Sequence, residues 1–198
     1  MSVIENEYLS VTFKNGIRIK DKTNNVDWIF PEFWYCVESD LIHEEVYGLM
    51  FRGIEPKFPL KFEYVAVKKI KDRIDCHCNI LRGNVEKRGE FDLSIRLIED
   101  SLEFEIKNIS NKIPSLLFPP ALECDTLVLP INQGILMKQP IENDFMVTPN
   151  GWTMRWFGGL KGKYGYIGIV TEGFNDSAVY ICGKHGINAG KLHVIPSW

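Results

Sequence analysis

Residues 102–140 read LEFEIKNISNKIPSLLFPPALECDTLVLPINQGILMKQP, and this stretch decides the fold class. Its first piece, residues 102–107, alternates apolar with charged side chains, which is the period-two pattern of a half-buried strand. A second, shorter strand is expected from Thr126 to Leu129, where Pro130 and a Gln133-Gly134 turn end it. Two such strands within one stretch predict a layered β domain.

The segment between these strands is too apolar to be a solvated loop. Pro114 and the pair Pro119-Pro120 interrupt it, and proline excludes both a helix interior and a central strand. We therefore expect residues 111–125 to form a buried crossing connection between two layers.

Towards the N-terminus the same alternation predicts a hairpin and a meander. The hairpin spans residues 8–20, because Asn15-Gly16 is a strong turn signal between two alternating runs. Short polar turns join the four strands of the meander. These strands are expected at residues 59–70, 74–81, 91–97 and 102–107, with 83–89 as a polar loop. Residues 27–52 are rich in aromatic side chains but have no helical period, which indicates long loops and short strands.

The second half of the chain contains more glycine. We expect an aromatic strand at 151–157, a turn rich in glycine and lysine at 158–165, and further strands at 166–171, 178–182 and 191–195. Gly168 lies inside one of these strands, so that strand must pack closely against a neighbour. Pro196-Ser197-Trp198 follows the last strand directly, and we interpret this as the interrupted end of an open or truncated sandwich. The whole chain, residues 1–198, is expected to be a single domain.

Composition excludes several classes of protein. The net charge of -3 argues against a nucleic-acid binder. The first residues lack a leader pattern, and nowhere do about 18 apolar residues run together, so we expect a cytoplasmic protein with no membrane partner. The five cysteines fit no disulfide framework and are expected to be reduced and mostly buried. No cofactor is expected. No metal site is expected either, because His77 must point away from Cys76 and Cys78, its neighbours on one strand.

Several pieces together resemble the β-supersandwich domains that are similar to galactose mutarotase and precede the catalytic barrel in glycoside hydrolases. The resemblance covers roughly residues 100 to 198. It rests on the strand ending at Asn108, the Phe118-Pro119 crossing, residues 125–130 with Gly134, residues 154–158, and residues 166–170 followed by 176–178. It implies an all-β antiparallel sandwich of the supersandwich type, with few or no helices. It also implies a catalytic barrel domain as a partner in the same parent protein.

Catalytic residues cannot be assigned from the sequence. Glycoside hydrolysis needs two carboxyl groups roughly 5 or 6.5–9.5 Å apart. The acids nearest the apolar segments are Glu123, Asp125, Glu172 and Asp176. The opposing interpretation is that these are turn and strand-end residues. An epimerase instead needs a histidine that converges with a carboxylate. The histidines are His43, His77, His185 and His193.

Sugar binding without catalysis requires an aromatic face and a few planar hydrogen-bonding groups. Trp152 and Trp156 are four apart on the expected aromatic strand, which places both rings on one face and Arg155 on the other. The opposing interpretation is that both tryptophans are core residues. The carbohydrate-binding candidates are Trp152, Arg155, Trp156, Glu172 and Asp176.

The leading hypothesis is a non-catalytic N-terminal module of a glycoside hydrolase-like protein, one that packs against the catalytic barrel and helps to bind carbohydrate. One alternative is a mutarotase-like aldose epimerase that acts alone, and another is an interaction domain with no sugar role. The unfinished edge at residues 191–198 also predicts self-association of the isolated chain.

Overall fold

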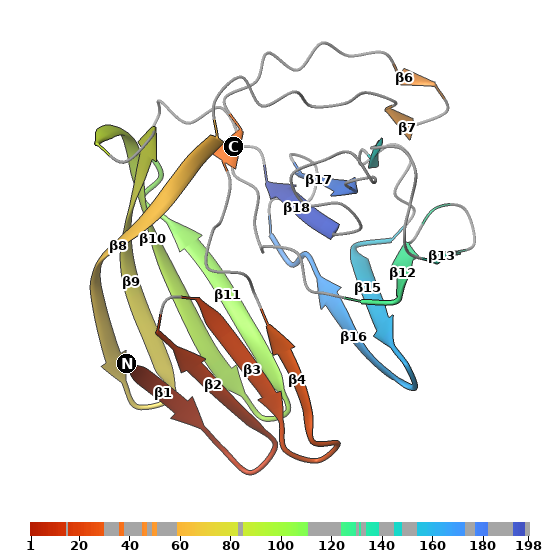
Figure 1. Cartoon of the computed structure of the whole chain (residues 1–198), viewed down its shortest axis with the longest axis horizontal. Helices are drawn as coiled ribbons and strands as arrows, with labels where there is room; N and C mark the ends of the chain where they lie inside the picture. Colours follow the sequence, from red (N-terminus) through yellow and green to blue (C-terminus); the bar gives the residue numbers. More distant parts are fainter. Residues whose placement is uncertain are drawn as a thin grey trace. The chain divides into compact units, whose positions relative to one another are not determined.

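The computed structural model describes residues 1–14, 16–29, 36–37, 45–46, 49–50, 59–82, 85–110, 124–129, 131, 134–138, 145–147, 154–172, 177–181 and 192–196. Every regular element in these ranges is a β-strand, and the paired strands are antiparallel (Figure 1). This confirms the predicted all-β antiparallel sandwich. No helix capable of spanning a bilayer is found in the described ranges.

Two compact units make up the chain. Unit 1 combines Met1–Glu38 with Phe58–Pro114, and unit 2 combines Ser39–Lys57 with Ser115–Trp198. Each unit is therefore built from two separated pieces of sequence. The expectation of one domain over residues 1–198 stays a prediction.

The first sheet of unit 1 has four strands in chain order: β1 (Ser2–Glu5), β2 (Leu9–Phe13), β3 (Ile17–Asp21) and β4 (Val26–Ile29). The predicted hairpin is confirmed, since β2 pairs with β3 with Phe13 opposite Ile17. Asn15 of its turn lies outside the described residues. β1 was not anticipated from the sequence, because its four residues are too few to establish an alternation.

The second sheet of unit 1 has the order β11-β10-β9-β8-β5. Its strands are β5 (Cys36–Val37), β8 (Pro59–Ile70), β9 (Arg73–Arg82), β10 (Glu86–Ile98) and β11 (Ser101–Lys107). The four-stranded meander is therefore confirmed. The polar loop expected at 83–89 was wrong from Glu86 onward, because residues 86 and 87 pair with the end of β9. Backbone pairing outweighs their polar composition.

Two β-bulges interrupt the pairing of β9 with its neighbours. One lies between Tyr64 and Ala66 on β8, so that Val65 is the extra residue. The other lies between Lys87 and Gly89 on β10, where Arg88 is the extra residue. A bulge adds one residue to one strand and bends it without changing the pairing on either side. β9 itself is uninterrupted between the two bulged strands.

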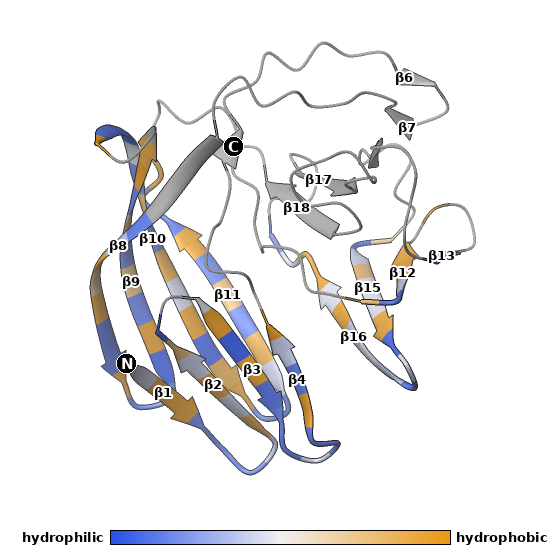
Figure 2. Cartoon of the chain, viewed as in Figure 1, coloured by the Kyte–Doolittle hydropathy of each residue, from blue (hydrophilic) through white to orange (hydrophobic). Residues whose placement is uncertain are grey.

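The two sheets of unit 1 share an apolar core. Their inward side chains are buried: Ile4, Val11, Phe13, Ile17, Ile19 and Trp28 from the first sheet, and Ile74, Cys76, Cys78, Ile80, Phe91, Leu93, Ile95 and Leu97 from the second. The Phe13 and Tyr64 rings meet edge to face across the sheets, with centroids 4.6 Å apart. Alternating hydropathy along these strands is visible in Figure 2. The core of unit 1 is therefore the space between two sheets of a sandwich.

One sheet of unit 2 has the order β13-β12-β15-β16. Its strands are β12 (Thr126–Leu129), β13 (Ile135–Lys138), β15 (Trp156–Lys161) and β16 (Tyr164–Ile169). The strand at 126–129 is confirmed, whereas β13 was not predicted. The aromatic strand expected at 151–157 was wrong at residues 154 and 155, which form a bend, and the turn expected at 158–165 was wrong because β15 and β16 occupy most of it.

Close packing explains why glycines extend these strands instead of ending them. A Cβ on Gly159 would lie 2.7 Å from Cε1 of Tyr166 and 2.9 Å from Cβ of Cys124. A Cβ on Gly168 would run into the ring of Phe157, 2.8 Å from its Cε2 atom. The close packing predicted for Gly168 is confirmed. Only residues without a side chain let the aromatic rings lie flat against the neighbouring strand.

The other sheet of unit 2 has the order β18-β17-β14-β7-β6. Its strands are β6 (Glu45–Val46), β7 (Leu49–Met50), β14 (Phe145–Val147), β17 (Ser177–Ile181) and β18 (Leu192–Pro196). The last two confirm, within a residue, the strands expected at 178–182 and 191–195. The crossing connection expected at 111–125 lies outside the described residues except for its last two.

Candidate functional site

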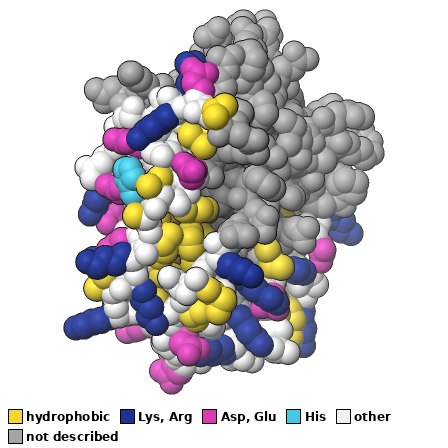
Figure 3. All heavy atoms as spheres, turned by 60° about the vertical axis from the view of Figure 1, so that its left-hand side comes forward, with side chains coloured by type: hydrophobic (Ala, Val, Ile, Leu, Met, Phe, Trp, Pro, Cys, Tyr) yellow, Lys and Arg dark blue, Asp and Glu magenta, His cyan; other side chains and the backbone are white. Residues whose placement is uncertain are grey.

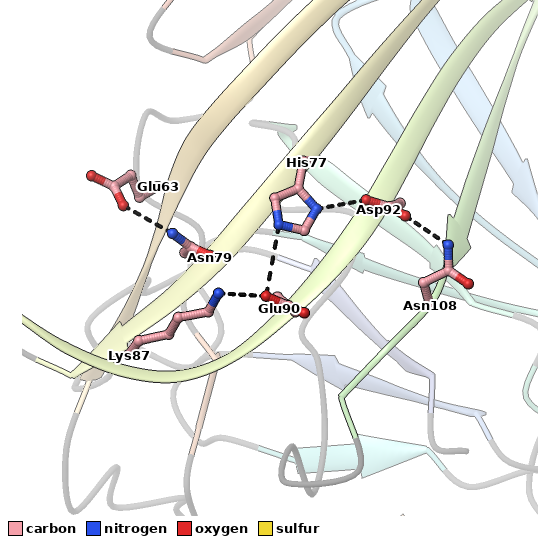
Figure 4. Close-up of polar contacts among 7 residues, drawn as sticks. All are labelled: Glu63, His77, Asn79, Lys87, Glu90, Asp92 and Asn108. Carbon is pink, nitrogen blue, oxygen red and sulfur yellow. Dashed lines mark hydrogen bonds and ion pairs between the residues drawn. The ribbon is translucent and has the colours of Figure 1, made fainter.

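The outward side chains of β9, β10 and β11 form a surface that we call the polar face, and His77 lies in it (Figure 4). Its ring Nδ1 is 2.7 Å from Oδ1 of Asp92, its partner in the β9–β10 register. Nε2 of the same ring is 3.7 Å from Oε2 of Glu90. The two carboxylates belong to residues two apart on β10, and the histidine ring lies between them. Of the groups on the described surface, this one most suggests acid–base chemistry.

Asp92 is held by two donors. The Nδ2 atom of Asn108 donates to its Oδ2 at 2.7 Å, and His77 contacts the other oxygen. Asn108 has a φ of 52°, which places its amide just beyond the end of β11. These contacts lower the pKa of the Asp92 carboxyl, with the Asn108 hydrogen bond as the larger cause. Asp92 is therefore a carboxylate near neutral pH.

Glu90 has a lowered pKa for a different reason. The Nζ atom of Lys87 donates to its Oε2, and the attraction of the lysine and of His77 adds to this effect. Asn79, which lies opposite Glu90, donates to Glu63 at 3.2 Å. On the other side of His77 and Asp92, Ser94 donates to Asp75 at 2.9 Å. Charged groups of both signs are intermixed over the surface, as Figure 3 shows. The polar face is thus a mixed hydrogen-bonded layer exposed to water.

The cysteines on β9 point the other way. Cys76 and Cys78 are buried free thiols, and burial raises the pKa of Cys76 to about 12 and that of Cys78 further still. His77 lies on the opposite side of the strand, as the alternation predicted. Within the described ranges no group of histidine, cysteine and acidic side chains could hold a metal ion. The expectation of reduced, buried thiols is confirmed for these two residues, whereas the side chain of Cys36 and the whole of Cys182 lie outside the described part of the structure.

The sugar-binding candidates lie at one end of the β15–β16 hairpin. Trp156 is the first residue of β15, and Arg155 is exposed in the bend before it. The backbone N–H of Val170 donates to the Arg155 carbonyl at 2.8 Å, which brings Glu172, two residues further on, to the same end. Arg155 precedes the strand, so the predicted alternation does not apply to it. Trp152 and Asp176 lie outside the described residues, and binding at these positions stays a prediction.

The described residues place one histidine candidate, His77, beside carboxylates, and these belong to Asp92 and Glu90 rather than to the four acids that the sequence analysis named. Asp125 accepts a hydrogen bond from the Gly162 N–H at 2.7 Å, so it stabilises the β15–β16 turn. Glu123 falls outside the described residues, as do His43 and His185. His193 is part of β18, where only the backbone is described.

A second surface was missed by the sequence analysis. Cross-strand pairing places Leu136, Val128, Gly158 and Ile167 in one row across the β13-β12-β15-β16 sheet. Ile169 and Leu160 flank this row, and we call the surface formed by these six residues the apolar face. Leu136, Ile167 and Ile169 are 67%, 72% and 68% exposed. The signal was present in Tyr-Gly-Tyr-Ile-Gly-Ile, whose isoleucines alternate with inward residues.

Comparison with known proteins finds a likeness in structure but not in sequence. No family model and no curated protein matches the sequence. The solved structure of α-N-acetylgalactosaminidase NagBb from Bifidobacterium bifidum, ligand free, matches with a TM-score of 0.62 at 13% identity. Its complex with Gal-NHAc-DNJ matches with a TM-score of 0.64 at 12% identity. Both matches cover 100% of this chain and 33% of the enzyme's chain. At this identity the likeness concerns the fold, which occurs there as one third of a glycoside hydrolase.

Proposed function

We propose that this chain is a non-catalytic, mutarotase-like β-sandwich module of a glycoside hydrolase-like protein, in which it packs against a catalytic barrel. The observation that carries this proposal is the match of the entire chain to one third of an α-N-acetylgalactosaminidase. Buried free thiols agree with a cytoplasmic location, which is part of the proposal.

A hydrolysis assay tests this role. The 198-residue chain and the natural protein isolated from its source are each incubated with an aryl α-N-acetylgalactosaminide and with a panel of other aryl glycosides. We expect no hydrolysis by the chain alone and hydrolysis of at least one glycoside by the natural protein. Hydrolysis by the chain alone would contradict the non-catalytic role, and an inactive natural protein would contradict the association with a glycoside hydrolase.

The proposed sugar contact lies at the open end of the β15–β16 hairpin. There the half-buried Trp156 supplies an aromatic surface, while Arg155 and Glu172 supply exposed charged groups. An N-acetylated galactose is the first ligand to test, since the matched enzyme acts on that class of sugar. Stacking of a pyranose ring on an indole changes the fluorescence of that indole.

Titration with N-acetylgalactosamine, followed by tryptophan fluorescence, tests this contact. We expect a saturable change that Trp156→Phe abolishes. Trp28→Phe is the matched control, because Trp28 is only 7% exposed in the core of unit 1. A change that survives Trp156→Phe would place the sugar elsewhere, for example at Trp152.

The epimerase remains a second candidate because His77 does lie beside a glutamate, with 3.7 Å between Nε2 and the Glu90 oxygen. Polarimetry of freshly dissolved α-galactose measures whether the chain accelerates its conversion to the mixture of anomers. An acceleration that His77→Gln removes and Asp75→Asn keeps would favour the epimerase over the module. An unchanged rate would leave the module as the function.

A further inference from the structure

The apolar face differs from ordinary exposed hydrophobic residues because its members are in register. Single apolar side chains on a surface are common and need no explanation. Here Leu136, Val128 and Ile167 follow one another across neighbouring strands, with Gly158 between the last two. Gly158 is buried and Val128 is half-buried, so the exposed members of the row are Leu136 and Ile167. Several large, exposed apolar side chains on one face of a sheet are typical of a surface that is covered in the assembled protein.

Charged residues surround this face, and most are cationic. In the described parts of residues 124–172 the cations are Lys138, Arg155, Lys161 and Lys163, and the acids are Asp125 and Glu172. Asp125 is already engaged with the turn at Gly162. The whole chain, by contrast, has a net charge of -3. Within the described part of the chain, the apolar face therefore has a positive border, although the protein as a whole is acidic.

The positive charge around the apolar face favours some binding partners over others. A second copy related by two-fold symmetry would bring the same cationic patch against itself, which like-charge repulsion disfavours. A carbohydrate chain fits the row itself poorly, because its branched aliphatic side chains offer neither stacking surfaces nor hydrogen bonds; the indole of Trp156, opposite Ile169, lies at the end of the face. A folded protein surface with an apolar ridge bordered by aspartate and glutamate complements both features.

We propose that the apolar face is the surface that docks a second protein domain, one that presents an apolar ridge with an acidic border. This inference rests on the proposed function, since a module that forms one third of a glycoside hydrolase needs a surface against which the rest of the protein packs. Ile167 and Ile169 insert into the ridge, and Lys138, Lys161 and Lys163 pair with the acidic border. The polar face stays in contact with water.

Hydroxyl-radical footprinting and zero-length carbodiimide cross-linking test the proposal without a known ligand. Both are applied to the isolated 198-residue chain and to the natural protein purified from its source. We expect Leu136, Ile167 and Ile169 to be labelled in the isolated chain and several-fold less in the natural protein. The exposed Val65 and Val85 of unit 1 serve as internal controls and should be labelled equally in both. Cross-links should join Lys138, Lys161 or Lys163 to carboxylates outside these 198 residues.

Three other outcomes would overturn the inference. Protection of the three residues in the isolated chain would mean that the face is covered within the chain. Cross-links between identical chains would identify a second copy as the occupant, and equal labelling in both samples would mean that nothing docks there.

If the natural protein hydrolyses glycosides but its apolar face is labelled as strongly as that of the isolated chain, only this inference fails. If it hydrolyses none yet protects the face against another domain, only the proposed function fails.

A variant pair gives a second readout in the natural protein. Ile167→Thr with Ile169→Thr keeps β-branched residues in β16 but removes their apolar ends. We expect it to lower the thermal unfolding temperature of the natural protein and to leave that of the isolated chain nearly unchanged. Val65→Thr with Val85→Thr is the matched control and should change neither. An equal effect of the two pairs in the natural protein would contradict docking.

Discussion

The β8–β11 sheet of unit 1 and the β12–β16 sheet of unit 2 are both antiparallel, and each buries one face, yet their outer faces are opposite in character. The first has His77, Asp92 and Glu90 among paired charges. The second has the exposed apolar side chains of Leu136, Ile167 and Ile169. The inner face of each sheet is apolar because it packs in the core, so the composition of the outer face indicates what that face contacts. The outer face contacts water in unit 1 and, as we propose, protein in unit 2.

The inner faces differ as well. Unit 1 fills the space between its sheets with bulky side chains such as Phe91 and Ile95, which are fully buried. Unit 2 instead lays aromatic rings on glycine, with Phe157 over Gly168 and Tyr166 over Gly159. The first arrangement is sensitive to loss of volume and the second to its gain. Four predictions test how the two units differ in their inner and outer faces, from the largest expected effect to the smallest.

Phe91→Ala should be the most destabilising of the four changes. It leaves a cavity at a residue with 0% exposure, and such truncations typically lower the free energy of unfolding by about 3–5 kcal/mol. Urea denaturation, with hydrogen exchange of β9 and β10 amides, measures the loss in unit 1. Val85→Ala removes apolar atoms at a 92% exposed position and should have little effect. If both variants lowered the free energy of unfolding by a similar small amount, the core of unit 1 would not be tightly filled at Phe91.

Gly168→Ala should destabilise unit 2 by about 1–3 kcal/mol, since overpacking a filled site shifts neighbours that cannot move freely. The new methyl group would collide with the Phe157 ring, which is buried. Gly165→Ala is the matched control on the same strand, because its nearest neighbour is the end of the exposed Leu160 side chain, at 2.8 Å. Hydrogen exchange of β15 and β16 amides measures both. Equal effects would mean that the Phe157 contact is not the constraint.

Asn108→Gly should raise the pKa of Asp92 towards its ordinary value, because it removes the larger of the two hydrogen bonds while glycine keeps the positive φ. In the wild type the depressed pKa means that these contacts stabilise unit 1 above the unfolded pKa of about 4, and that this contribution is lost as the pH falls through the folded value. NMR titration of the Asp92 carboxyl carbon measures the shift. An unmoved titration would assign the effect to His77 instead.

Ile167→Thr should have the smallest effect on the isolated chain, changing its free energy of unfolding by no more than about 0.5 kcal/mol. The side chain is 72% exposed, so its truncation removes little packing. Denaturant unfolding of the isolated chain measures it. A loss comparable to that of Gly168→Ala would show that the apolar face is already buried within the chain, and the contrast between the two outer faces would disappear.

Alternation predicted unit 1 well because its strands are long and have one wet face. The two glutamates between Leu102, Phe104 and Ile106 show clearly which side of the strand faces inward. The same reasoning failed at Gly158 and Gly159, since glycine indicates a turn or a close approach equally well when the neighbour is unknown. The apolar face was missed because exposure on an edge strand depends on sheet order, which the sequence did not provide.

The pairing of His77 with Asp92 could not be derived from the sequence for a related reason. The two residues are brought together by the β9–β10 register, and a shift of one residue would turn Asp92 towards the core. That register depends on the bulge at Arg88. Both histidine and aspartate were visible in the sequence, but the distance between them was not.

The two bulges that flank β9 have a consequence for how this chain can vary in length. Arg88 is the surplus residue between Lys87, opposite Leu81, and Gly89, opposite Ile80. Its deletion would restore regular pairing and leave Phe91 facing inward, whereas loss of any single residue between Phe91 and Leu97 would turn part of the strand inside out. Val65 has the same position on β8. Descendants of this sequence can therefore lose one residue at either of these two points while the interior of unit 1 is kept unchanged.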